Sequence, residues 1–146
     1  MKYKLPCLFL FFAPFSTLAT LHCPAINEIK HGAGVYTAVA ADDTEWSGTL
    51  QGELPQFGTI KDFSEAMMIV EGSSEEKRGK FQKCTYNLHA EGKQIDMFYE
   101  NKAWLASISD KPHWKYEQGG FLNYYTCSDV APEACQFDIV VASATF

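Results

Sequence analysis

The sequence lacks the residue patterns by which catalytic and metal sites are usually recognised. No serine stands in a Gly-x-Ser-x-Gly motif, no two histidines have the His-x-x-x-His spacing, and no two cysteines have the Cys-x2-Cys spacing of a zinc site. The histidines are scattered, and each is interpreted as a loop or surface residue: His22, His31, His89 and His113. The sequence therefore predicts no catalytic residue, no metal site and no cofactor.

Basic residues are also scarce, with 12 lysines and arginines against 18 acidic residues. Loss of a signal peptide over residues 1–19 would remove two lysines and leave ten basic residues against 18 acidic ones, a formal charge of −8. Nucleic acids and anionic membranes attract basic patches, so neither is an expected partner. The expected partner is another protein, and a cationic one is favoured electrostatically.

A hydrophobic run long enough to span a membrane is absent. The apolar stretch Leu5–Phe15 is shorter than the roughly 20 residues of a spanning helix and contains two prolines. It follows two lysines and precedes Thr17-Leu18-Ala19, which is the three-part pattern of a secretory signal peptide. We expect cleavage after Ala19, a single β-rich domain over residues 20–146, and a periplasmic or extracellular location without stable membrane insertion. An uncleaved anchor is the alternative.

The chain beyond residue 19 keeps an even number of cysteines: Cys23, Cys84, Cys127 and Cys135. In an exported chain this number predicts two disulfides. Of the three possible pairings we favour Cys23–Cys84 with Cys127–Cys135, because the second pair brackets a short loop that contains proline. The other two pairings stay open. By loop entropy, the long closure would contribute about 4 kcal/mol and the short one about 2.5 kcal/mol.

The stretch Phe81–Glu100 carries the clearest strand pattern in the chain. Alternate residues share one face in its first run (Cys84, Tyr86, Leu88) and in its second run (Ile95, Met97, Tyr99). The polar residues 89–93 between the runs include Gly92, which suits a hairpin loop. We therefore predict a central β-hairpin that a disulfide from Cys84 ties to distant chain.

Shorter strands are expected on both sides of this hairpin, over residues 35–40, 45–50, 66–70, 101–109 and 136–141. Residues 62–68 also fit a short helix capped by Asp62, although a strand is favoured. Residues 51–59 and 71–80 are interpreted as loops. About eight short strands predict a mainly β domain, built as a small antiparallel sheet, sandwich or barrel with at most one short helix and stapled by disulfides.

Aromatic residues cluster late in the chain: Trp104, Trp114, Tyr116, Tyr124 and Tyr125. Such side chains fill the cores of small β domains, and they dominate protein interfaces when they are exposed. The hypothesised partner-binding residues are Trp104, Trp114 and Tyr116. Solvent exposure of the two tryptophans would separate a binding role from a core role.

Several short patterns occur along the chain: Cys23-Pro24, Tyr36-Thr37-Ala38, Glu45-Trp46-Ser47-Gly48, Phe63 with Ala66, Cys84-Thr85-Tyr86, Tyr125-Thr126-Cys127 and Cys135-Gln136-Phe137. Together they resemble a family of small exported gamma-proteobacterial proteins classified as a domain of unknown function. The resemblance implies a bacterial, disulfide-containing, periplasmic or secreted protein. It carries over the four cysteines and the strand that holds Trp46, and no catalytic residue.

Three functions are compatible with these patterns. The first hypothesis is a secreted or periplasmic non-enzymatic protein that binds another protein, as a host-interaction or envelope-interaction factor. A narrower hypothesis is an inhibitor of a basic hydrolase such as lysozyme, which the acidic charge would attract. The third is a small secreted hydrolase assembled from distant residues, which needs a pocket joining His89 or His113 to a carboxylate and a hydroxyl.

Overall fold

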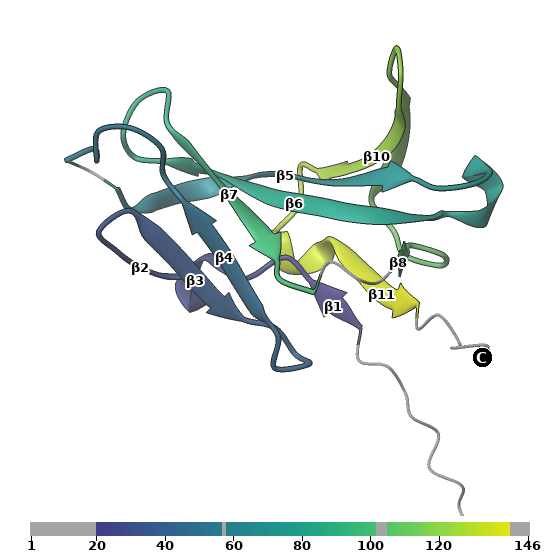
Figure 1. Ribbon diagram of the computed structural model, residues 1–146, viewed down its shortest axis with the longest axis horizontal. Helices are drawn as coiled ribbons and strands as arrows, with labels where there is room; N and C mark the ends of the chain where they lie inside the picture. Colours follow the sequence, from purple (N-terminus) through teal and green to yellow (C-terminus); the bar gives the residue numbers. More distant parts are fainter. Residues whose placement is uncertain (1–19, 57, 102–104, 141–146) are drawn as a thin grey trace, which may run out of the picture.

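The computed structural model describes residues 20–56, 58–101 and 105–140 of the 146-residue chain. The predicted signal peptide and Trp104 lie outside these residues. Within the described ranges there are eleven β-strands and three short 3-10 helices (Figure 1), and no helix there is long and apolar enough to cross a membrane. The predicted mainly β, antiparallel fold is confirmed, and each 3-10 helix is one short turn: η1 (Ile26–Glu28), η2 (Ser74–Glu76) and η3 (Pro132–Ala134).

Two long strands run through the middle of the sheet (Figure 1), namely β5 (Ile60–Val70) and β6 (Arg78–Leu88). They pair antiparallel along their whole length, and the register shifts at three places. Irregularities of this kind bend a strand pair and increase its twist. The sheet accordingly curls into a half-barrel with one concave face.

The predicted central hairpin is confirmed. After β6 the chain turns into β7 (Gln94–Tyr99), and the two strands pair from Cys84 opposite Met97 to Asn87 opposite Gln94. The residues assigned to the inner face are all buried: Cys84, Tyr86, Leu88, Ile95, Met97 and Tyr99. The alternation of apolar side chains therefore gave the correct face for both strands.

The sheet divides along one edge of β6. Residues 84–87 of this edge pair with β7, whereas Arg78 and Gly79 pair with β8 (Leu105–Ser107). One arm continues from β7 through β4 (Glu45–Thr49) and β3 (Val35–Val39) to β2 (Lys30–Gly32). The other arm continues from β8 through β11 (Gln136–Val140) to β1 (Leu21–His22). On the far side of β5 lie β10 (Asn123–Ser128) and then β9 (Trp114–Gln118).

An aromatic cluster joins the two arms. The buried indole of Trp46 on β4 meets Phe81, Tyr99 and Phe137 with ring centroids 5.6, 5.4 and 6.2 Å away. Phe81 also stacks on Phe137 of β11 at 4.1 Å. Aromatic pairs at these separations add about 0.5–1.5 kcal/mol each beyond the burial of their surface. The cluster therefore stabilises the packing of the two arms against each other where the sheet divides.

Both favoured disulfides are confirmed, Cys23–Cys84 and Cys127–Cys135, with Cα atoms 5.9 and 5.8 Å apart. The first joins the segment after β1 to the middle of β6. The second joins β10 to the start of β11 across η3. Disulfides persist in oxidising compartments, so they point to a location outside the reducing cytoplasm.

One sequence-based interpretation is confirmed and another needs correction. Residues 62–68 belong to strand β5, as was favoured over a short helix, and in this strand Phe63 packs against Tyr86 at 5.3 Å while Ala66 and Met68 are buried. The loop predicted over residues 71–80 ends at Lys77, because Arg78, Gly79 and Lys80 begin β6. Gly79 is buried between two strands, and a glycine leaves no side-chain pattern by which its burial could be predicted.

Candidate functional site

The β9–β10 hairpin is the most prominent projection of the molecule and rises away from the rest of the sheet (Figure 1). Its strands pair from Trp114 opposite Cys127 to Gln118 opposite Asn123. At the tip, Gly119 N–H donates to the carbonyl of Leu122 at 2.9 Å. This bond closes a tight turn that leaves Gly120 and Phe121 at the apex.

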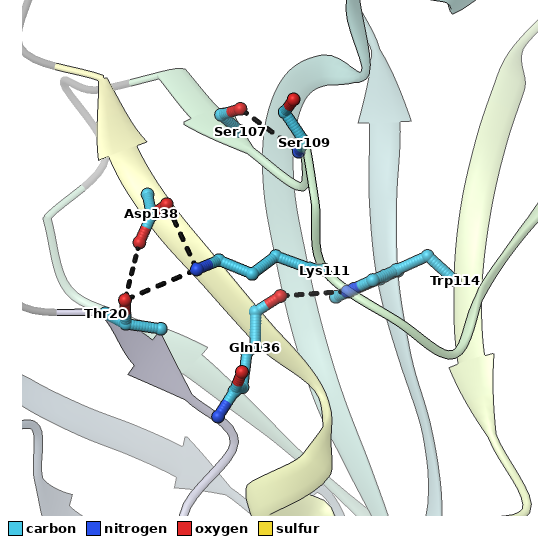
Figure 2. Close-up of polar contacts among 7 residues, drawn as sticks. All are labelled: Thr20, Ser107, Ser109, Lys111, Trp114, Gln136 and Asp138. Atoms are coloured by element: carbon cyan, nitrogen blue, oxygen red, sulfur yellow. Dashed lines mark hydrogen bonds and ion pairs between the residues drawn. The ribbon is translucent and has the colours of Figure 1, made fainter.

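The base of the hairpin is fixed by Trp114. Its indole Nε1–H donates to the backbone carbonyl of Gln136 at 2.9 Å, which connects β9 to β11 (Figure 2). The ring also lies 6.3 Å from Phe81, edge to face, and so contacts the aromatic cluster. Because its polar atom is satisfied internally and its ring is half-buried, Trp114 positions the hairpin.

The loop that leads into β9 has its own polar anchor (Figure 2). Lys111 Nζ lies 3.3 Å from an Asp138 carboxylate oxygen, and Thr20 donates to the other oxygen at 2.9 Å. The Lys111 side chain is only 17% exposed. A partly buried ion pair that also accepts a hydroxyl hydrogen bond is held more firmly than an open surface pair.

The middle of the hairpin rests on Tyr125 of β10. This side chain is buried, and its hydroxyl donates to the Ser74 carbonyl at 2.8 Å. Burial, with a smaller contribution from the neighbouring Tyr116, raises the pKa of the Tyr125 phenol. Tyr116 leans on Tyr125 with ring centroids 5.4 Å apart. The disulfide from Cys127 completes the attachment, so the hairpin is rigid at its base.

The tip presents apolar side chains to solvent. Phe121 is 104% exposed and Leu122 is 55% exposed, while Tyr116 further down β9 is 38% exposed. Scattered apolar residues on a surface need no explanation, but a fully exposed phenylalanine beside an exposed leucine at the apex of a braced hairpin is uncommon. The hairpin therefore displays two apolar side chains at its apex.

The structure places the hypothesised binding residues differently from one another. Tyr116 is exposed, Trp114 is half-buried and bonded to Gln136, and Trp104 lies outside the described residues. Of the other clustered aromatics, Tyr124 is half-buried and Tyr125 is buried. Sequence reasoning did not single out Phe121 and Leu122. The preceding Gly119-Gly120 was the available signal, because two glycines between alternating strand patterns predict a hairpin turn.

The hydrolase hypothesis needs a pocket that joins His89 or His113 to a carboxylate and a hydroxyl. His89 and His113 are both exposed. A hollow of about 370 Å³ beside His89 is lined by two carboxylates, Asp62 and Glu91. None of its described lining residues carries a hydroxyl group. Asp62 already accepts from the Asn87 amide at 2.6 Å. The described residues also contain no cluster of three histidine, cysteine or carboxylate side chains that would hold a metal ion.

A second hollow of about 400 Å³ lies where the sheet divides. Its described walls come from β6, β7, the segment after β7 and β11: Lys80, Phe81, Gln82, Phe98, Tyr99, Asn101 and Ile139. Lysine is the only residue among them that carries a charge at neutral pH. No sequence pattern predicts this hollow, because its position depends on which strands share the edge of β6.

Fold and site together define a class of protein: a small, disulfide-stapled, curled antiparallel β domain that displays one apolar hairpin tip. The chain belongs to the family described as "Protein of unknown function (DUF3757)", which it matches over residues 17–138. No curated protein and no solved structure matches the chain.

Proposed function

We propose that this protein is an exported, non-enzymatic binding module that contacts a partner protein through the tip of the β9–β10 hairpin. The single observation that carries the proposal is the full exposure of Phe121 beside the exposed Leu122. Transfer of a phenylalanine or leucine side chain from water into an apolar pocket contributes about 1.5–3 kcal/mol. Two such residues would supply much of the affinity of a small interface.

The rigidity of the hairpin supports this role. A tip held by Trp114, the Lys111–Asp138 pair and a disulfide loses little conformational freedom when it binds. The signal-peptide pattern over residues 1–19 and the two disulfides support export, and an exported module would act in the periplasm or outside the cell. The acidic charge favours a cationic partner over a nucleic acid or an anionic membrane.

The test is a quantitative capture of envelope and host proteins by immobilised protein. Phe121→Ser with Leu122→Ser removes the apolar tip, and Val35→Ser with Leu54→Ser removes two other exposed apolar side chains as a matched control. We expect at least one protein to be retained by the wild type and the control and to bind the tip variant about a hundredfold more weakly in a direct titration. Equal retention of all captured proteins by the three forms would refute the proposal. If instead the wild type binds lipid vesicles and the tip variant does not, the tip is a membrane contact and the proposal is also refuted.

One observation favours a second candidate, the inhibition of a basic hydrolase such as lysozyme. A hollow of about 300 Å³ next to β3 is lined by Glu28, Asp43 and Glu45 around Val39, which is 71% exposed, with Lys30 as its only cation among the described lining residues. Such a site suits an arginine or lysine side chain of a cationic enzyme. Inhibition of lysozyme that weakens between low and high salt would support this candidate. Absence of inhibition at low salt would remove it.

A further inference from the structure

Strand β9 is the longest of the terminal strands of the sheet in the described residues. It pairs with β10 on one side only, whereas the other terminal strands, β2 and β1, have three and two residues. Open edges expose backbone N–H and C=O groups that another strand can pair with. No backbone hydrogen bond outside the β9–β10 ladder reaches Tyr116 or Gln118 within the described chain.

The turn fixes which backbone groups of β9 point outward. Gly119 and Leu122 form a hydrogen-bonded pair at the tip. Hydrogen-bonded and non-hydrogen-bonded pairs alternate along an antiparallel ladder. Counting back from Gly119, the N–H and C=O groups of Gln118, Tyr116 and Trp114 face away from β10. The outer edge therefore presents three evenly spaced residues that are ready to pair.

The sequence of β9 is complementary to itself when it runs antiparallel to a second copy. If Tyr116 lies opposite Tyr116 of the second copy, Lys115 lies opposite Glu117, and Glu117 lies opposite Lys115. Both charged residues are exposed, and neither makes an ion pair within the described residues. They fall at non-hydrogen-bonded positions, where facing side chains approach most closely.

Other registers do not give this match. Sliding one strand by two residues in one direction places Lys115 opposite Lys115 of the second copy. Sliding it by two residues in the other direction places Glu117 opposite Glu117 of the second copy. Like charges directly opposite each other destabilise a strand pair. The charge pattern therefore selects one register, and this register has the two-fold symmetry of most homodimers.

We infer that two copies of this chain pair through β9 to form one continuous sheet across a two-fold axis at Tyr116. The antiparallel ladder places the two hairpin tips at opposite ends of the joined strands. Phe121 and Leu122 of both copies thus stay exposed, and the dimer presents two tips to partners. Because a five-residue ladder is small, the dimer dissociates on dilution.

Charge reversal tests the register directly. Protein purified after export is compared by sedimentation equilibrium over a concentration series. Lys115→Glu alone, or Glu117→Lys alone, places like charges at both facing positions, and we expect each to weaken dimerisation about tenfold. Mixing the two single variants restores opposite charges at both positions, so the mixture should form a heterodimer with wild-type affinity. The double variant Lys115→Glu with Glu117→Lys should also dimerise like the wild type.

A backbone variant provides an independent measurement. Gln118→Pro removes an outward N–H, and proline is tolerated at such an edge position. It should weaken the dimer, whereas Gln118→Ala should not, and both should retain the wild-type circular dichroism spectrum. A wild type that stays monomeric at millimolar concentration, a dimer indifferent to the charge reversals, or a mixture that fails to pair would each overturn the inference. Loss of the dimer in the tip variant Phe121→Ser with Leu122→Ser would also overturn it, because it would place the dimer contact at the tip.

Discussion

At the scale of single residues, Gly79 permits the division of the sheet. It lies on β6 between Val70 of β5 and Ala106 of β8, so strands approach it from both sides. A Cβ atom at this position would lie 1.9 Å from the carbonyl oxygen of Ile69. Only glycine fits there without moving the backbone of β5.

Gly79→Ala should therefore destabilise the protein by about 2–3 kcal/mol, as an overpacked interior site does. Gly32→Ala is the matched control, because a Cβ at Gly32 meets no atom within 4 Å. It should change the free energy of unfolding by less than about 0.5 kcal/mol. Urea unfolding followed by tryptophan fluorescence measures both, and equal stability of the two variants would contradict this account of the division.

At the scale of elements, the two disulfides have separate tasks. Cys23–Cys84 attaches the segment after β1 to the central hairpin, whereas Cys127–Cys135 attaches β10, and with it the tip, to β11. The central hairpin is therefore scaffold, and the β9–β10 hairpin carries the proposed contact. The structure locates the apolar tip outside the segment with the strongest strand pattern.

Removing each disulfide separately should reveal this difference. Cys23→Ala with Cys84→Ala should cost about 4 kcal/mol and leave partner capture unchanged wherever the protein remains folded. Cys127→Ala with Cys135→Ala should cost about 2.5 kcal/mol and also increase amide hydrogen exchange in β9 and β10. Hydrogen exchange with mass spectrometry makes the comparison. If hydrogen exchange became faster evenly over the whole sheet in both variants, the two disulfides would not stabilise different parts of the fold.

At the scale of the whole molecule, buried phenols link stability to pH. Burial raises the phenol pKa of four tyrosines above the ordinary value: Tyr36, Tyr86, Tyr99 and Tyr125. The nearby carboxylates of Glu133 and Glu28 raise the pKa of Tyr86 further. Tyr86 donates to the Pro24 carbonyl at 2.5 Å in the core. Below pH about 10 these phenols are protonated in both the folded and the unfolded state.

As the pH rises above about 10, the unfolded chain releases phenolic protons that the folded protein retains. The unfolded state then binds fewer protons, so the free energy of unfolding falls with rising pH. Urea unfolding at pH 8, 9, 10 and 11 should show a plateau and then a decline, and Tyr86→Phe should make the decline shallower. A stability that stays constant to pH 11 would be inconsistent with this explanation.

Much of this architecture follows from local patterns in the sequence. Alternation identified the hairpin around Cys84 and the buried side of β6 and β7, and the even cysteine count with one short proline loop gave the correct disulfide pairing. Strand alternation is a local property of the chain, and the disulfide pairing depends on only four cysteines. The strand at residues 62–68 was ambiguous, because a short apolar run fits helix and strand equally until a partner strand exists.

The division of the sheet and the exposure of the tip were not predictable in the same way. Arg78 and Lys80 flank Gly79 with charges, so the start of β6 had the composition of a solvated loop. The exposure of Phe121 depends on how far the hairpin projects from β5, which no local pattern reports. Trp114 and Tyr116 are both aromatic residues of one strand, and no sequence pattern shows that the Trp114 indole donates to the backbone carbonyl of Gln136.

The central claim is that the hairpin tip contacts a partner protein, and photo-crosslinking in the producing cells tests it most directly. A photoreactive phenylalanine analogue replaces Phe121, and the same analogue at Val39, the exposed residue in the second candidate hollow, is the control. We predict that illumination joins the protein to a specific second polypeptide from position 121 and that this adduct is absent from position 39. No adduct from position 121, or the same adduct from both positions, would contradict the claim.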